Sequence, residues 1–234
     1  MNLKHFLYSR PELITGQLHR TYRLLTKAGL LDRELSGTVA TGHGAGIIPL
    51  NRRHVADMLC CARGINYVFP SARTVIDVQG QSSQVIQIDE KANVVNFAIS
   101  EACASCSGCF LEVITNVLRI GVDDIGPLSL NAKNPVTFTT GCAVFGESEA
   151  ISRVAEGVPK EDILAGVHKA LASQISLLID RVGLKEPCAI SGGGGLNIGL
   201  TKELESLGIQ LLVPDQPQII NALGAALLAK EQDN

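Results

Sequence analysis

The stretch TVIDVQGQSSQVIQI at residues 74–88 decides the fold class, because it has the pattern of a β-hairpin. Apolar and β-branched residues predict one strand over 74–78, and a similar pattern predicts the return strand over 84–88. Between them lies the polar turn Gln79-Gly80-Gln81, with a glycine at its centre. We therefore expect an antiparallel hairpin with a tight turn.

Strands and helices alternate on the C-terminal side of this hairpin. Hydrophobic periodicity predicts strands over 94–99, 136–140, 188–190 and 209–213, and helices over 110–118, 147–155, 160–182, 200–207 and 218–230. Before the hairpin it predicts helices over 13–31 and 52–63 and a short strand over 37–40. Gly64 is expected to end the second of these helices. A hairpin followed by alternating strands and helices is typical of α/β proteins.

The composition excludes several classes of protein. Apolar residues make up 46% and charged residues 18% of the chain, which is too apolar for a disordered protein. Aromatic residues make up 4% and Trp is absent, so small aliphatic residues must build the core, as in an α/β sheet. The net charge of -3 gives no basis for nucleic acid or an anionic membrane as a partner. No apolar run reaches the ~20 residues that span a bilayer, and the first residues lack a signal-peptide pattern. We therefore expect a cytoplasmic protein.

The chain has seven cysteines, and three of them show no sign of a special role. Cys60 and Cys61 fall in a predicted helix and Cys188 in a predicted strand, where we expect ordinary buried thiols. Because the protein is expected in a reducing compartment, we do not expect the cysteines to form disulfide bonds.

The other four cysteines are candidate metal ligands: Cys103, Cys106, Cys109 and Cys142. The first three form a C-x2-C-x2-C run, which resembles the opening of a bacterial ferredoxin ligand run without its fourth cysteine. Cys103 and Cys142 each lie where a strand or loop passes into a helix. A helix N-terminus favours the thiolate, which is the form that binds metal. Ordinary buried cysteines stay open as the alternative.

Two glycine-containing turns are candidates for holding a nucleotide. In the hairpin turn, Asp77 offers a hard oxygen to Mg²⁺, while Gly80 and Gln81 allow a close backbone approach to phosphate. The run Gly192-Gly193-Gly194-Gly195, with Asn197 after it, follows a predicted buried strand and precedes a helix. It is not a P-loop, because the Lys-Ser/Thr ending is missing. The alternative for both turns is a purely structural role.

Two further polar residues are of interest. Glu147 lies in the first turn of a predicted helix, where it either compensates the helix dipole or positions a metal ion or water. His43, in a glycine-rich loop, is the histidine most open to a functional role.

Taken together, these segments resemble the BadF/BadG/BcrA/BcrD ATPase family. The resemblance is carried by TGHG at 41–44, ARTVIDVQGQ at 72–81, CASCSGCFLE at 103–112, CAVFGESE at 142–149, the glycine run and GAA at 224–226. It extends from about residue 36 onward, with the motifs in the family's order. It implies an α/β, actin/hexokinase-like (ribonuclease H-like) ATPase fold. Residues 1–71 with 215–234 would form an incomplete first subdomain, and 72–214 a second one with the phosphate turn, the cysteines and the glycine run.

The resemblance also implies ligands and partners. The ligands would be ATP, Mg²⁺ and a [4Fe-4S] cluster shared between two subunits, held by Cys103 and Cys142 with Cys106 and Cys109 as alternatives. The partners would be a sister ATPase subunit in a homo- or heterodimer, the catalytic subunits of a CoA-thioester reductase or dehydratase, and ferredoxin as electron donor. The segment Gly126-Pro127-Leu128-Ser129 is most similar to benzoyl-CoA reductase subunits. The leading prediction is therefore a subunit that drives ATP-dependent, low-potential electron transfer to such a reductase.

Three alternatives stay open: an activator of a 2-hydroxyacyl-CoA dehydratase, a non-hydrolysing subunit that completes a shared cluster, and a kinase with structural cysteines. The sequence also departs from the family pattern. The family usually opens with an Asp-x-Gly-Ser hairpin, which does not precede the helix predicted from residue 13. Gln79 and Ser82 replace a glycine and a carboxylate, and Cys106 and Cys109 stand where glycine and arginine are usual. Whether the chain itself hydrolyses ATP is therefore left open.

Overall fold

A computed structural model describes residues 37–42, 45, 53–100, 107–139 and 142–231. The chain divides into two compact units, one made of residues 1–70 with 219–234 and the other of residues 71–218. We call them unit 1 and unit 2. The helix predicted over 13–31 and the residue His43 lie outside the described residues.

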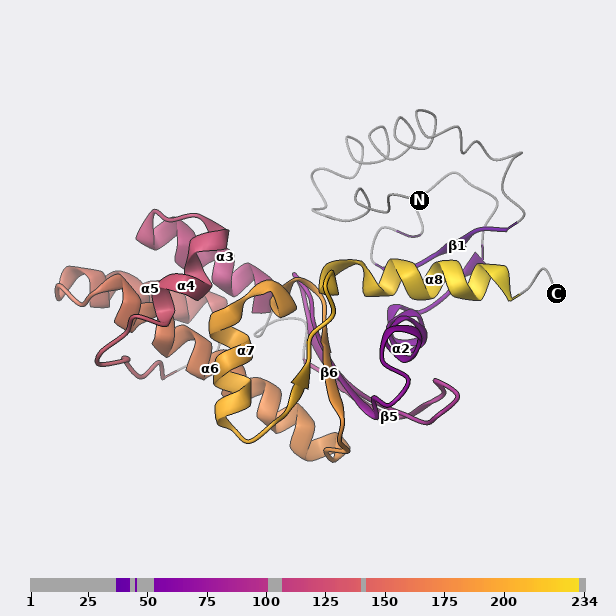
Figure 1. Ribbon diagram of the computed structural model, residues 1–234. Helices are drawn as coiled ribbons and strands as arrows, with labels where there is room; N and C mark the ends of the chain where they lie inside the picture. Colours follow the sequence, from indigo (N-terminus) through magenta and orange to yellow (C-terminus); the bar gives the residue numbers. More distant parts are fainter. Residues whose placement is uncertain (1–36, 43–44, 46–52, 101–106, 140–141, 232–234) are drawn as a thin grey trace. The chain divides into compact units, whose positions relative to one another are not determined.

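Unit 2 contains a mixed sheet with the strand order β5-β4-β3-β6-β7 (Figure 1). The strands are β3 (Thr74–Val78), β4 (Ser83–Ile88), β5 (Val94–Ile99), β6 (Cys188–Ser191) and β7 (Leu211–Leu212). The pairs β3–β4 and β4–β5 are antiparallel, whereas β3–β6 and β6–β7 are parallel. The predicted hairpin is thereby confirmed, and β3 is central, with all five residues buried.

Five α-helices of unit 2 are described: α3 (Ser107–Leu118), α4 (Ile125–Ser129), α5 (Ala143–Ala155), α6 (Lys160–Val182) and α7 (Ile198–Ser206). Three short 3-10 turns are also described: η4 (Val122–Asp124) between α3 and α4, η5 (Gly193–Leu196) between β6 and α7, and η6 (Pro217–Ile219) after β7. Helix α6 packs on β4 and β5 and also contacts α4 and α7, while α3 packs on α5 (Figure 1). The core between them is aliphatic, with Phe110 and Phe138 as its aromatic members.

Helix α6 has the predicted ends. Pro159 precedes its first residue, and Gly183 follows its last one with a φ of 85°, which favours glycine. By length and composition α6 could cross a membrane, but 67% of its most apolar window is buried inside the protein. A core helix has this property, and its apolar residues are explained by packing in unit 2.

The strand predicted over 136–140 is wrong for its described residues, which are irregular. The Val136 N–H donates to the Asp162 carbonyl, at the start of α6, and the Thr139 N–H donates to the Glu149 carboxylate. Val136 and Phe138 pack on the core of unit 2, and residues 136–139 pair with no strand in the described part of the chain.

Unit 1 contains helices α2 (Asp57–Val68) and α8 (Ile220–Lys230) and a parallel pair of short strands, β1 (Val39–Ala40) and β2 (Arg53–His54). The end at Gly64 of the helix predicted over 52–63 is wrong, because α2 continues past it. A Cβ atom at Gly64 would collide with the carbonyl oxygen of Ile220, and one at Gly224 with that of Cys60. These glycines let α2 and α8 approach closely, so Gly64 serves packing rather than termination.

Candidate functional site

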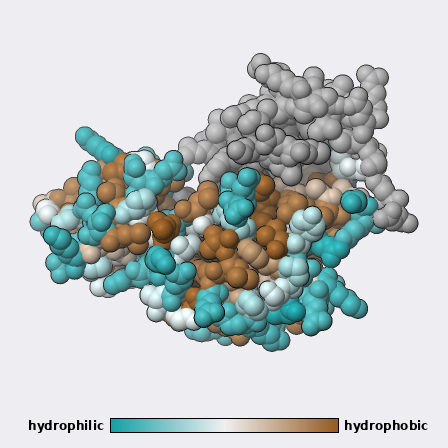
Figure 2. Space-filling view, in the orientation of Figure 1, coloured by the Kyte–Doolittle hydropathy of each residue, from teal (hydrophilic) through white to brown (hydrophobic). Residues whose placement is uncertain are grey.

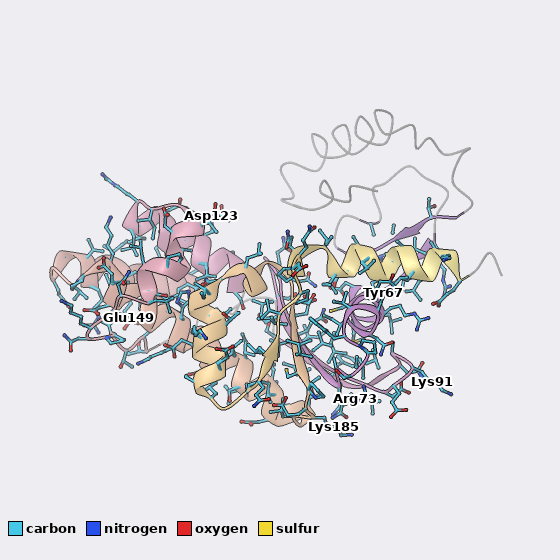
Figure 3. The ribbon with its side chains drawn as sticks, viewed as in Figure 1. Tyr67, Arg73, Lys91, Asp123, Glu149 and Lys185 are labelled. Atoms are coloured by element: carbon cyan, nitrogen blue, oxygen red, sulfur yellow. The ribbon has the colours of Figure 1, made fainter. Side chains whose placement is uncertain are left out.

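The carboxyl ends of β3 and β6 bring the two candidate turns together. In the parallel pair, Asp77 lies opposite Ser191. The hairpin turn at 79–82 follows β3 and the glycine run follows β6, so both leave the same edge of the sheet. In Figure 3, Arg73 and Lys185 mark the other end of these strands. The structure therefore joins two motifs that lie more than a hundred residues apart in the sequence.

The glycine run is held tightly against this edge. Gly192 has a φ of 81°, and a Cβ atom there would collide with the carbonyl oxygen of Val78. A Cβ at Gly194 would lie 2.5 Å from the Val78 Cβ, and one at Gly195 would lie 2.7 Å from Pro217. Gly193 is exposed. Three glycines are thus needed for close packing, and the fourth lies on the surface.

Asp77 is a fully buried carboxylate on β3. Its Oδ2 accepts hydrogen bonds from Gln79 Nε2 at 2.6 Å and from Gln84 Nε2 at 2.8 Å. Beside it, the Ser191 hydroxyl is buried and makes no hydrogen bond to any residue in the described part of the chain. Both are polar groups at the strand ends where an α/β protein places its ligands.

The hairpin turn is also attached to the first turn of α3. The N–H of Gly108 donates to the Gln79 carbonyl at 3.2 Å, and the N–H of Cys109 donates to the Gly80 carbonyl at 3.0 Å. The hydroxyls of Ser83 and Ser107 lie 2.5 Å apart. A Cβ atom at Gly108 would lie 2.6 Å from the Gly80 Cα, so the two backbones touch. The turn and the cysteine-bearing end of α3 are one packed structure.

Helices α3 and α5 meet at a second contact. A Cβ atom at Gly146 of α5 would lie 2.5 Å from the Phe110 ring, which packs edge-on against Phe138 at a centroid distance of 6.3 Å. Cys142 is the N-cap of α5, half-buried and not in a disulfide bond. Cys109 in the first turn of α3 and Cys142 are therefore carried by helices that pack on each other.

The cysteines divide as follows. Cys103 and Cys106 lie outside the described residues. Cys109 is disulfide-bonded, so the expectation of reduced cysteines is wrong at this position. That expectation rested on the compartment, whereas a disulfide bond also depends on whether the fold brings two thiols into bonding geometry, which the sequence does not show. Within the described ranges, no three His, Cys, Asp or Glu side chains gather into a metal site.

Cys60, Cys61 and Cys188 are buried as expected. Burial, with a smaller contribution from the Glu186 carboxylate, raises the pKa of the Cys188 thiol to about 12. Such a thiol stays protonated and is a poor metal ligand.

The remaining candidates are exposed. Glu147 is exposed on α5, and Gln81 is exposed at the hairpin turn. Another acidic residue of α5, Glu149 (Figure 3), accepts hydrogen bonds from the N–H and hydroxyl of Thr139, each at 3.1 Å. Glu147 is therefore the acidic residue of this helical turn whose carboxylate faces solvent.

Asn197 has a structural role that the sequence did not reveal. As the N-cap of α7 its Oδ1 accepts from Gly199 N at 3.0 Å and Leu200 N at 3.2 Å. Its Nδ2 therefore donates to His168 Nε2, 2.9 Å away. His168 is fully buried on α6, and burial lowers its pKa to about 4. No local sequence signal joins a histidine within a helix to a cap 29 residues away.

Replacing Asn197 with alanine is expected to lower the free energy of unfolding by about 2 kcal/mol. The change removes a helix cap and leaves a buried imidazole nitrogen without its donor. Urea unfolding followed by circular dichroism measures the loss. Asn116→Ala, at an exposed position of α3, is the matched control and should change stability by less than about 0.5 kcal/mol. Equal effects of the two changes would contradict the assigned role.

Comparison with known proteins places the chain in a family. The sequence profile of the BadF/BadG/BcrA/BcrD ATPase family matches residues 14–229. The chain belongs to this family. Its fold is accordingly the actin/hexokinase-like ATPase fold, as the resemblance implied.

Two relatives and one solved structure illustrate the range of this ATPase family. A 2-hydroxyisocaproyl-CoA dehydratase activator from Clostridioides difficile is 34% identical, over 93% of this chain and 82% of the relative. A benzoyl-CoA reductase subunit from Thauera aromatica is 35% identical, over 87% of this chain and 74% of the relative. The structure of a 2-hydroxyisocaproyl-CoA dehydratase activator from Clostridium difficile with bound ADPNP superposes with a TM-score of 0.86 at 33% identity, covering 94% of this chain and 82% of that one.

Proposed function

We propose that this chain is an ATP-dependent activator of a 2-hydroxyacyl-CoA dehydratase, passing single electrons to it from an iron–sulfur cluster. The observation that carries the proposal is the attachment of the hairpin turn to α3. The N–H groups of Gly108 and Cys109 donate to carbonyls of the turn. A movement of the turn should therefore also move α3, the helix that carries Cys109. An activator needs such a connection between its nucleotide and its electron carrier.

The comparisons favour the dehydratase over the reductase that the sequence analysis put first. The activator relative and the activator structure align over larger shares of both chains than the reductase relative. The leading reductase prediction is therefore replaced by the alternative, an activator, and the two share an ATP-driven role beside a CoA-thioester enzyme.

The edge formed by β3 and β6 fits a magnesium nucleotide. Asp77 supplies a carboxylate, the ligand type that Mg²⁺ prefers, and Gly193, the exposed member of the glycine run, offers backbone that phosphate could approach. The buried Ser191 hydroxyl adds a donor without a partner among the described residues. ATP bound here would supply the free energy of its hydrolysis. Asp77, Gly80, Gln81 and the run 192–195 are the residues we assign to binding it.

Cys142 fits a cluster ligand. Its thiol sits at a helix N-terminus, is half-buried and is not in a disulfide bond. Val144 and Phe145 follow it with 69% and 68% of their surface exposed, which suits a surface covered by a second subunit. Figure 2 shows further apolar areas in brown on the visible face. A [4Fe-4S] cluster shared there, with Cys103 as second ligand, would supply a one-electron carrier. Cys109 is a ligand only after its disulfide bond is reduced.

The test of this proposal is the iron content of anaerobically purified, reduced protein. One cluster shared by two subunits corresponds to about two iron atoms per chain, with an EPR signal after reduction. Cys142→Ala should lose the iron and the signal. Cys188→Ala is the matched control and should keep both, because its buried thiol stays protonated. A folded, colourless wild-type protein, or a Cys142→Ala protein with full iron content, would end the cluster assignment.

The reductase is the second candidate, supported by the 35% identity to the Thauera aromatica relative. Reconstitution separates the two candidates. With ATP and a reductant, the protein should restore turnover to a 2-hydroxyacyl-CoA dehydratase that lacks its activator. Restoration only of a benzoyl-CoA reductase that lacks its ATPase subunits would instead support the reductase. Cluster binding without nucleotide affinity would identify a non-hydrolysing partner subunit.

A further inference from the structure

Asn197 closes the glycine run with its backbone and caps α7 with its side chain. Its N–H donates to the Gly194 carbonyl at 3.1 Å, which ends the turn η5. Its Oδ1 accepts from the N–H groups of Gly199 and Leu200, at 3.0 Å and 3.2 Å. One residue therefore fixes both the end of the glycine run and the start of the helix that follows it.

The side-chain nitrogen of Asn197 is held by a buried histidine. Asn197 Nδ2 lies 2.9 Å from His168 Nε2. Because Nδ2 can only donate, Nε2 accepts, and the proton of the neutral imidazole is on Nδ1. Nδ1 is buried and makes no hydrogen bond to any described residue. The bond to Asn197 is thus the only hydrogen bond of the imidazole within the described part of the chain.

Helices α4 and α7 enclose this contact. A Cβ atom at Gly199 of α7 would collide with the His168 ring and with the Ser129 hydroxyl of α4. One at Gly126 of α4 would lie 3.0 Å from Asn197 Oδ1. The two glycines let both helices approach the imidazole and the amide closely. The imidazole therefore has a fixed position from which it holds Asn197.

A histidine with an unpaired nitrogen is a costly residue in a core. A buried donor without an acceptor lowers stability, and an apolar side chain would avoid this loss. The neighbours of His168 along the buried face of α6 are apolar, namely Leu164, Leu171 and Ala172. A residue that departs from such a pattern is expected where function requires it.

From this arrangement, and on the basis of the proposed function, we infer that His168 is a positioning residue for the magnesium nucleotide. It is fully buried and acts through Asn197. By accepting the Asn197 amide it keeps the glycine run closed and the exposed backbone of Gly193 in place for phosphate. Without this acceptor the half-buried amide is best satisfied by turning to water. Such a turn opens η5, and nucleotide binding has to close it again.

The test is the affinity of the full chain for a non-hydrolysable ATP analogue with Mg²⁺, measured by isothermal titration calorimetry. His168→Leu removes the acceptor and should weaken binding about tenfold, because the cost of an unpaired amide returns when the run closes. His168→Gln keeps an acceptor and should bind within about twofold of wild type. In the nucleotide-free protein, the amides of Gly195 and Asn197, which close the run, should exchange hydrogen faster in His168→Leu than in His168→Gln.

The matched control is Thr74→Val, at the other end of β3. The buried Thr74 hydroxyl donates to the Lys185 carbonyl at 2.8 Å and accepts from the Lys185 N–H at 2.9 Å, so this change also removes buried hydrogen bonds. It should lower stability and keep the nucleotide affinity. Equal weakening of binding in Thr74→Val and His168→Leu would mean that affinity only follows stability, and the inference would be overturned.

Asn197→Ser is the second variant, and it decides the question if His168→Leu does not fold. Serine still caps α7 but has no amide for His168, so binding should again weaken about tenfold. If wild type binds and these variants bind equally well, or if hydrogen exchange does not change, the inference alone falls. It also falls if His168→Gln binds as weakly as His168→Leu. If wild type does not bind the nucleotide, the proposed function and the inference fall together.

Discussion

Replacing Phe110 with alanine is expected to lower the free energy of unfolding of unit 2 by about 3–5 kcal/mol. The ring is fully buried, packs edge-on against Phe138 and fills the space that Gly146 leaves open. Truncation removes a close contact between α3 and α5. Under the proposed function the variant should also lose iron, because α5, which begins at the proposed ligand Cys142, loses this contact with α3.

Phe145→Ala is the matched control, since it makes the same chemical change one residue away from Gly146, on a side chain that is 68% exposed. It should cost less than about 0.5 kcal/mol. The chain has no Trp, and its three Tyr lie in unit 1, so far-UV circular dichroism in urea is the measurement for unit 2. Equal losses in the two variants would show that Phe110 does not join the helices.

The second large effect is a loss of stability in mild acid that depends on His168. Burial lowers its pKa from 6.5 to about 4, and the donor from Asn197 reinforces the neutral form. In the unfolded chain the imidazole binds its proton near pH 6.5. Between pH 6.5 and 4 the unfolded state therefore binds more protons, and stability falls as the pH falls. Above this window the contribution is fully present, and over it about 3 kcal/mol is lost.

His168→Gln should remove this dependence, because the amide carbonyl can still accept from Asn197 but does not titrate. The free energy of unfolding, measured from pH 7.5 to 4 for both proteins, isolates the effect because carboxylates titrate equally in each. The advantage of wild type over the variant should shrink by about 3 kcal/mol. His54→Gln, at an exposed residue of β2, controls for the loss of a histidine. A constant difference across the window would contradict the assignment.

The sequence predicted those elements whose signals are local. The bounds predicted for β3, β5 and α6 are the observed ones, because β-branched runs and the Pro159 and Gly183 end signals act within a few residues. The predicted start of α5 at 147 is four residues late. Gly146 lies within α5, where its missing side chain admits the Phe110 ring, so that tertiary packing accounts for a glycine inside the helix. Gly64 likewise lies within a helix, α2, because its missing side chain lets α8 approach closely, and the predicted end there was wrong.

The candidate site was predicted as separate motifs and not as an arrangement. The chemistry of Asp77 and the glycine run could be read from residue types. Their convergence depends on β3 pairing with β6, across a segment that contains most of unit 2. The same limit explains His168 and Asn197, because only tertiary packing brings a cap and a core histidine together.

The order of assembly follows from how the two units are threaded. Unit 2 is one unbroken segment, while α2 and α8 of unit 1 are made before and after it. During synthesis on the ribosome, α2 emerges first, and α8 becomes available to pack on it only after the whole of unit 2 has emerged. Its buried face, with Cys60 and Ile65, has no partner from α8 in that interval. This nascent helix is where we expect a chaperone to engage, and where slowed translation beyond residue 218 would most increase aggregation.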